Sequence, residues 1–227
     1  MTKNMSVVLH TRALCKVFAI LMCAAVVGGC SKHENDPKAQ YELGMKYASG
    51  KGVLKDLGKA AEWFEKAAMQ GDAQSQVNLG EMYASGQGVT QDAVKSAEWY
   101  EKAAVQGNPV AESMIGFIYS EGLGVSKDLT KGVEWLEKAA GHGNAMGQTW
   151  LAQKYVAGDG VPKDITKAAQ WFEKAAEQGN SDAQFAIGAL YAEGTGVPKD
   201  DNLSAKWIKK AALQGNLQAH EWIGDKD

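Results

Sequence analysis

The sequence predicts an all-α fold, a solenoid of five 36-residue helix–turn–helix repeats followed by a C-terminal capping helix. Two observations predict it. Tryptophan recurs every 36 residues in five similar segments, the first of which reads KAAEWFEKAAMQG (59–71), and glycine, tyrosine and small residues recur at the same period. The repeats occupy residues 36–71, 72–107, 108–143, 144–179 and 180–215, and a partial sixth covers 216–227.

Residues 1–29, which precede the repeats, predict a signal peptide. Lys3, Arg12 and Lys16 are followed by the apolar run VFAILMCAAVV (17–27), which is shorter than the roughly 20 residues of a membrane-spanning helix. The ending VGGC (27–30) resembles the lipobox of bacterial lipoproteins. This resemblance implies cleavage before Cys30, acylation of Cys30 and, because Ser31 follows, sorting to the outer membrane. An ordinary signal peptide cleaved after Gly29 is the alternative.

Removal of residues 1–29 changes the composition of the chain. It leaves 21 Lys and Arg against 27 Asp and Glu, a formal net charge of −6 that argues against nucleic acid or an anionic membrane surface as partner. Cys30 becomes the only cysteine, so no disulfide is expected and packing must supply the stability. The linker 30–35 reaches at most about 18 Å, and the lipid anchor would therefore hold the repeats close to the membrane.

The first helix of each repeat is predicted from its cap, its apolar stripe and its stop. Asp or Asn stands at the N-cap position of every repeat, as in Asp36 and Asn108. Small, aliphatic and tyrosine residues then follow at i, i+4 and i+8, for example Ala183, Ile187 and Tyr191, which places them on one buried face. Glycine ends the helix, and a loop of the type SGKGVLKD closes with an aspartate that caps the second helix.

The second helix carries the repeat's large core residue. Its tryptophan and an Ala-Ala pair form an apolar face, while Glu62 and Lys66 are expected to pair at i, i+4 on the solvent side. Twelve-residue helices are marginal alone, so neighbouring repeats must cover each other. The predicted structural core comprises Trp63, Trp99, Trp135, Trp171 and Trp207 with Tyr47, Tyr83, Tyr119, Tyr155 and Tyr191.

These columns carry a resemblance. A small residue, Leu-Gly and Tyr on one helix, then G-x-G-V-x-x-D and K-A-x-x-W-x-x-K-A-A-x-x-G, resemble the Sel-1-like repeat, a relative of the tetratricopeptide repeat, over essentially all of 36–227. The resemblance implies a right-handed α-solenoid. Leu203 and Lys209 depart from the pattern, and the sixth repeat has one helix, which indicates a capping end.

Motifs for catalysis, cofactors or metals are not evident. The G-x-G-V loop follows a helix and recurs five times, so it is interpreted as a turn and not as a nucleotide-binding loop. His33, His142 and His220 are far apart in sequence and are interpreted as solvated histidines. We therefore expect no catalytic residue, no cofactor and no metal.

The first helices of the middle repeats interrupt the polar pattern. Lys38, Glu42, Gln74, Asn78 and Glu81 occupy the positions opposite the buried stripe in the first two repeats. In the next two, these positions hold apolar residues, and Trp222 returns in the last helix. We interpret this cluster as a partner-binding patch on the concave face of a solenoid. The alternative is inter-repeat packing, in which Phe117 and Trp150 are ordinary core. The cluster comprises Val110, Met114, Phe117, Met146 and Trp150.

Three functional hypotheses follow. The first is a non-catalytic interaction scaffold of the bacterial cell envelope, lipid-anchored on the periplasmic side of the outer membrane, that binds an envelope protein. The second, which the resemblance implies for some lipoproteins of this family, is a periplasmic immunity protein that neutralises a secreted type VI-like effector such as a lipase. The third is a hydrolytic enzyme, which would need a converging polar site that the repeats do not show.

Overall fold

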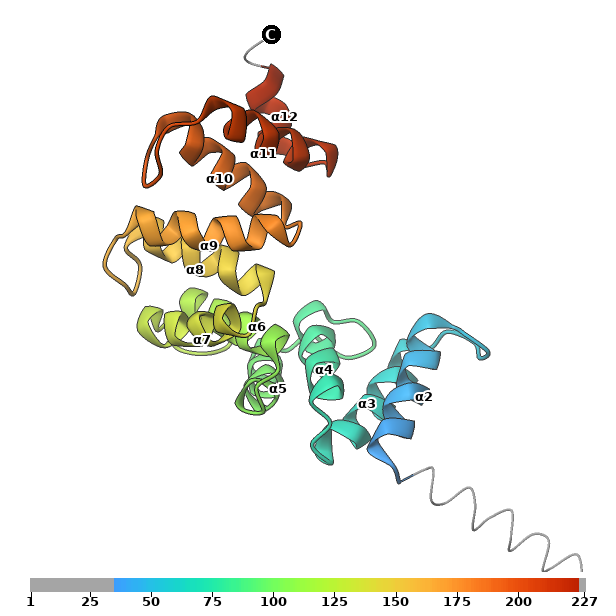
Figure 1. Ribbon diagram of the computed structural model, residues 1–227. Helices are drawn as coiled ribbons and strands as arrows, with labels where there is room; N and C mark the ends of the chain where they lie inside the picture. Colours follow the sequence, from blue (N-terminus) through green and yellow to red (C-terminus); the bar gives the residue numbers. More distant parts are fainter. Residues whose placement is uncertain (1–34, 225–227) are drawn as a thin grey trace, which may run out of the picture. The chain divides into compact units, whose positions relative to one another are not determined.

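The computed structural model describes residues 35–224, which form eleven α-helices and no strand (Figure 1). The predicted signal peptide, Cys30 and the linker before Asn35 lie outside these residues. By its internal contacts the chain divides into two compact units. Unit 1 ends at Asp72 and contains α2 (Pro37–Ser49) and α3 (Leu57–Met69). Within residues 35–224, none of the helices has the length and apolarity that a bilayer crossing needs.

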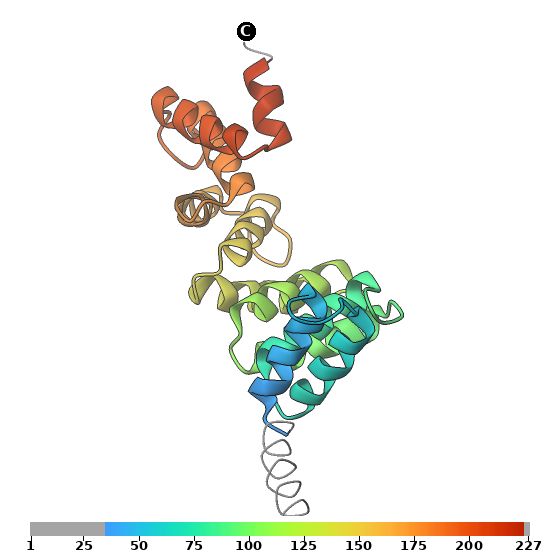
Figure 2. The same cartoon turned by 90° about the vertical axis from the view of Figure 1, so that its right-hand side faces the viewer.

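Unit 2 begins at Ala73 and contains four further helix pairs and a short last helix, which follow one another in chain order (Figures 1 and 2). The helices α6, α8 and α10 each pack against the second helix of their own repeat and against the second helix of the repeat before it, as α6 does with α7 and α5, whereas α4 packs against α5 and α12 against α11. The first helices are α4 (Ala73–Ser85), α6 (Pro109–Glu121), α8 (Ala145–Ala157), α10 (Ser181–Glu193) and α12 (Leu217–Gly224), and the second helices are α5 (Ala93–Val105), α7 (Leu129–Gly141), α9 (Ile165–Glu177) and α11 (Asp201–Leu213).

Side-chain caps and left-handed glycines set the helix ends. The Asn108 side chain accepts hydrogen bonds from the backbone N–H groups of Val110 and Ala111, and Asp128 accepts one from Lys131 N–H at 2.9 Å. Gly122 ends α6 with a φ of 75°, which glycine adopts without a Cβ penalty. The loop then returns to the helix, because Asp128 N–H donates to the Tyr119 carbonyl at 2.8 Å.

The two helices of a repeat approach closely where the first helix lacks a side chain. A Cβ added to Gly116 of α6 would lie 2.8 Å from Leu136 Cγ and 2.9 Å from the Gly132 carbonyl oxygen. The glycine column that recurs in the sequence therefore marks the contact line between the helices of one repeat. The two helices can shift only slightly past each other at this glycine, so it fixes the register in which they pack.

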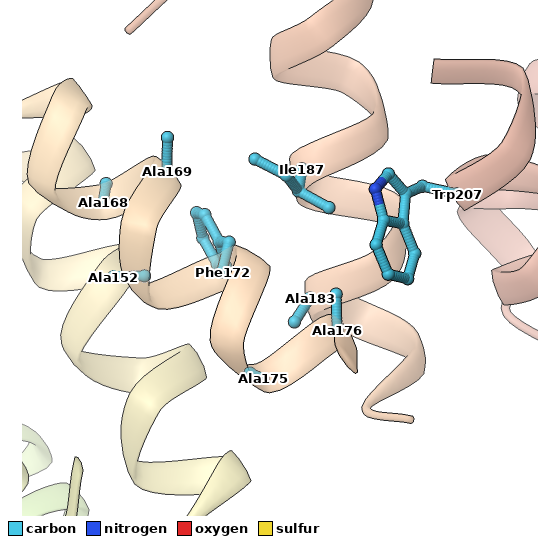
Figure 3. Close-up of a cluster of buried hydrophobic side chains, with 9 residues drawn as sticks. All are labelled: Ala152, Ala168, Ala169, Phe172, Ala175, Ala176, Ala183, Ile187 and Trp207. Carbon is cyan, nitrogen blue, oxygen red and sulfur yellow. The ribbon is translucent and has the colours of Figure 1, made fainter. Parts of the chain in front are cut away.

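The core runs through unit 2 between successive helix pairs. In Figure 3, Phe172 of α9 and Ile187 of α10 lie among alanines of α8, α9 and α10, and Trp207 of α11 lies beside α10. Phe172 is 4% exposed and Ile187 is fully buried. Alanine at the surrounding positions allows the helices to pack around one large side chain per layer.

The repeated tryptophans are covered by lysines. Trp99 and Trp207 are buried, while Trp63, Trp135 and Trp171 are partly buried. A lysine three residues later lies over each indole ring, at 3.7 Å from the ring centroid for Lys102 over Trp99. The expected Glu62–Lys66 pair is thus replaced, since Lys66 Nζ lies 3.9 Å from the Trp63 ring. A partly desolvated cation over an indole face is a favourable alternative to an exposed ion pair.

Candidate functional site

The apolar cluster that the sequence analysis identified lies on two neighbouring first helices of unit 2. Val110, Met114 and Phe117 belong to α6, and Met146 and Trp150 belong to α8. These two helices contact each other directly. We call the surface formed by these five residues the α6–α8 face.

Phe117 and Trp150 stack on each other across the boundary between the third and fourth repeats. Their ring centroids are 4.9 Å apart and their planes are inclined by 27°. Trp150 also packs against the buried cluster that contains Leu136 and Leu151. The two rings therefore fill the space between the repeats, as the packing alternative expected, but both remain only partly buried. Offset stacking of this kind contributes about 1 kcal/mol beyond the area buried.

The rest of the α6–α8 face is more accessible. Val110 is 43% exposed, and Met114 and Met146 are partly buried. Met114 lies against the buried cluster around Ile115 and Ile118. The face thus has a rigid aromatic centre with flexible methionines and an exposed valine beside it, a composition that suits contact with another protein.

An ion pair accompanies the aromatic stack. Lys154 Nζ lies 3.8 Å from Glu121 Oε1, and these residues stand one helical turn after Trp150 and Phe117. The Lys154 side chain is only 15% exposed. The pair therefore joins α6 and α8 a second time and neutralises the lysine at the edge of the face.

Tyrosine hydroxyls form a second type of joint between repeats. Tyr119 donates to Glu101 of α5 at 3.0 Å, and Lys131 Nζ donates to the Tyr119 hydroxyl at 2.6 Å. This hydrogen bond and the Glu101 carboxylate raise the pKa of Lys131. The tyrosine–glutamate bond recurs in later repeats, between Tyr191 and Glu173 at 3.1 Å and between Tyr155 and Glu137 at 3.4 Å. Because it recurs, we interpret the cluster as a structural joint and not as a catalytic centre.

A third joint was not foreseen in the sequence. In four repeats, a buried glutamine of the first helix accepts a hydrogen bond from a glutamine 30 residues later; the donor–acceptor pairs are Gln70–Gln40, Gln106–Gln76, Gln178–Gln148 and Gln214–Gln184. In the third repeat, Glu112 and His142 replace them, with 2.7 Å between His142 Nδ1 and Glu112 Oε2. His142, expected to be a solvated histidine, is half-exposed but pairs with a carboxylate that is 2% exposed. Comparison of the two sequence columns would have revealed the exchange.

No group of three or more His, Cys, Asp or Glu side chains within residues 35–224 is arranged to hold a metal ion. The predicted tyrosines of the repeat core are all partly buried. Cys30, the predicted lipidation site, lies outside the described residues, so its acylation remains a prediction.

Comparison with known proteins identifies the repeats. The Sel1 repeat family matches residues 37–72, 73–108, 109–144, 145–180 and 181–216. A Sel1 repeat protein from Oxalobacter formigenes is similar in structure, with 37% identity and a TM-score of 0.79 over 84% of this chain and 78% of that one. The family and the solenoid fold class predicted from the sequence are thereby confirmed.

Two further solved structures are similar. One is c5321, a protective antigen of uropathogenic Escherichia coli strains with an SLR fold, at 39% identity and a TM-score of 0.78 over 84% of this chain. The chain spans only 41% of that protein's length. The other is the immunity protein Pa5087 from Pseudomonas aeruginosa, at 24% identity and a TM-score of 0.55 over 81% of this chain and 67% of that one, a likeness of fold alone. Comparison with curated protein sequences finds no match.

Proposed function

The chain belongs to the Sel1 repeat family, whose helical scaffold is suited to protein–protein interaction, and from this premise we propose that it is a non-catalytic scaffold that holds a protein partner against the α6–α8 face. The observation that carries the proposal is the apolar cluster on adjacent first helices, with the Phe117–Trp150 stack at its centre and Val110 exposed beside it. Partly exposed aromatic anchors with an apolar surround are typical of interaction sites.

The proposal places the protein in the bacterial cell envelope, anchored by acyl chains on Cys30 to the periplasmic side of the outer membrane. Its support is the sequence alone, namely the basic start, the short apolar run and the VGGC ending at residues 27–30. A short linker would hold unit 1 near the membrane surface. The partner is then a protein that resides at that membrane or approaches it.

Immunity against a secreted toxic effector is the second candidate. The observation in its favour is the similarity in fold to the immunity protein Pa5087. Such a role needs only a binding surface, which the α6–α8 face would supply. The identity of the captured partner separates the two candidates, because an effector supports immunity and an envelope component supports scaffolding.

Photo-crosslinking from the α6–α8 face tests the docking surface. A photoreactive residue replaces Val110, which is 43% exposed, in the full chain expressed in its native host. The matched control replaces Val105 of α5, an exposed valine outside the face that is 71% exposed. We expect one discrete crosslinked product from position 110 and none from position 105. Products from position 105 alone would place the binding surface elsewhere and contradict the proposal.

Substitution of Cys30 tests the anchor separately. In Cys30→Ser, acylation is blocked, and we expect the protein to move from the outer-membrane fraction to the soluble fraction. Cys23→Ser, inside the predicted signal peptide, is the matched control and should leave the fractionation unchanged. Retention of the Cys30→Ser protein in the membrane fraction would refute lipid anchoring through this residue.

A further inference from the structure

Charge is unevenly divided between the two sets of helices in unit 2. The first helices α4, α6, α8, α10 and α12 carry a single lysine, Lys154, whose charge Glu121 already neutralises. Apart from His220 of α12, their other exposed ionisable side chains are carboxylates: Glu81, Glu121, Asp182, Glu193 and Glu221. The surface that the first helices present is therefore acidic as well as apolar.

The lysines of the helices lie instead on the second helices. Those that follow the repeated tryptophans cover the indole rings, as Lys102 does over Trp99 and Lys138 over Trp135. Lys131 is bound to Tyr119 and Glu101. The second helices also carry glutamates next to their lysines, such as Glu98 and Glu134, so the two signs of charge are mixed there. In α5, α7 and α9 the lysines and glutamates are equal in number, and α11 carries three lysines against one aspartate, so an excess of acidic residues occurs only on the first helices of unit 2.

The carboxylates flank the α6–α8 face along the row of first helices. Glu81 occupies in α4 the position that Phe117 occupies in α6, and it is exposed. Asp182 occupies in α10 the position of Val110 and Met146. Glu121 is the last residue of α6, one turn after Phe117. Glu121 is already paired with Lys154, so the carboxylates left to flank the apolar centre lie in the preceding repeat and in the following repeat.

We propose that the segment which docks on the α6–α8 face is a basic amphipathic stretch of protein, with apolar side chains against Phe117, Trp150 and the methionines and with Lys or Arg side chains facing the flanking carboxylates. This inference rests on the proposed function and specifies the chemistry of its partner. Complementary charge accelerates association and excludes acidic competitors. The same carboxylates repel anionic lipid headgroups and nucleic acids, so a membrane surface or a polynucleotide does not fit this face.

Three labelled 18-residue peptides test the inference by fluorescence anisotropy with residues 30–227. The first has Leu on one helical face and Lys on the other, the second has Glu in place of Lys, and the third has Ser in place of Leu. We expect the Leu/Lys peptide to bind, and the other two to bind at least tenfold more weakly. An increase in NaCl from 50 to 500 mM should also weaken the binding of the Leu/Lys peptide, because the flanking charges are exposed and salt screens them.

Two pairs of variants locate the binding. Val110→Ser and its control Val105→Ser remove one exposed apolar side chain from α6 or from α5. Glu81→Lys and its control Glu98→Lys reverse one exposed carboxylate on the first or on the second helix of the same repeat. We expect each first-helix variant to lower the affinity for the Leu/Lys peptide about three- to tenfold, and each control variant to change that affinity less than twofold. Circular dichroism melts confirm that all four variants fold.

The failures are distinguishable. If the Leu/Glu peptide binds as tightly as the Leu/Lys peptide, or if Glu98→Lys weakens binding as much as Glu81→Lys does, the inference of a basic partner is wrong. A crosslink at position 110 would still support the docking face in that case. If the protein binds phosphatidylglycerol vesicles but not the Leu/Lys peptide, and Val110→Ser abolishes the vesicle binding, the ligand of this face is a membrane surface and not a protein segment. Loss of both the crosslink and all peptide binding would overturn the proposed function itself.

Discussion

The third and fourth repeats have helices of the same length with the same N-cap residue types, yet they join their two helices with different chemistry. In the fourth repeat, Gln178 donates to Gln148 at 2.8 Å, and Gln148 donates to the Ala140 carbonyl at 3.2 Å. In the third, a buried Glu112 carboxylate meets His142. A glutamine accepts and donates at once and carries no charge, whereas an ionised carboxylate accepts only and is costly to bury without its partner.

The third repeat differs at a second place. Ser120 is fully buried on α6, and its hydroxyl has no hydrogen-bond partner among the described residues. Gly132 stands opposite, and a Cβ there would clash with the Ser120 hydroxyl oxygen. In the second repeat, by contrast, the buried Ser96 hydroxyl donates to the Gly80 carbonyl at 2.8 Å. The comparison shows that one backbone plan accommodates buried serines with and without a hydrogen-bond partner, and that Ser120 of the third repeat is the one without.

The largest expected effect comes from removing the histidine partner. His142→Ala leaves the buried Glu112 carboxylate unpaired, and we expect it to lower the free energy of unfolding by about 2–3 kcal/mol, discounted because His142 is half-exposed. The matched change Gln178→Ala in the fourth repeat should cost only about 1 kcal/mol, because Gln148 keeps its bond to Ala140. Urea titration measures both, and equal losses would mean that the two joints are energetically alike.

The serines should respond in opposite directions. Ser120→Ala removes a buried hydroxyl without a partner, and we expect it to raise the free energy of unfolding by about 1 kcal/mol. Ser96→Ala removes a hydroxyl that is bonded to the Gly80 carbonyl and should lower it by about 1 kcal/mol. Thermal melts of the two variants against the parent give the signs. A destabilised Ser120→Ala protein would show that the hydroxyl has a favourable role in the folded state.

Conversion of the third repeat to the chemistry of the others sharpens the comparison. The double variant Glu112→Gln/His142→Gln restores the amide pair, and we expect its stability to lie within about 1 kcal/mol of the parent although each single substitution is destabilising. The coupling energy from the double-mutant cycle is the quantity to measure. A coupling near zero would indicate that Glu112 and His142 act independently, against the 2.7 Å contact.

Alkaline pH extends the comparison to the second repeat. Burial and the Glu81 carboxylate raise the pKa of Tyr100 well above its ordinary value of 10.0. Below about pH 10 both folded and unfolded chains hold the proton and stability is unaffected; above it the unfolded chain ionises first, so stability declines as pH rises.

Tyr100→Phe isolates this contribution, because Phe172 occupies the same position in the fourth repeat. We expect the free energy of unfolding of the variant to lie within about 1 kcal/mol of the parent value at pH 8. Between pH 8 and pH 11 the variant should lose less of it than the parent does. Urea midpoints at the two pH values provide the measurement. Parallel declines of parent and variant would show that Tyr100 does not contribute to the alkaline transition.

Periodic positions could be predicted from the sequence, whereas the choice between competing partners could not. The 36-residue columns predicted the helices, the caps such as Asp128 and the stops such as Gly122, because each depends on local backbone chemistry. Lys66 could reach either Glu62 or the Trp63 ring, and only the packed geometry selects the ring. Phe117 and Trp150 were open to two interpretations because stacking between repeats depends on how closely α6 and α8 approach.

The joints between helices also bear on how the protein reaches this structure. The tyrosine–glutamate bonds close intervals of 18 residues and the amide pairs intervals of 30. Such short closures cost little chain entropy, and proteins dominated by them fold rapidly. A helix pair can therefore form its internal contacts without any later part of the chain, and the next helix pair can then pack against it. Assembly that proceeds along the chain exposes at most one uncovered apolar face at its growing end.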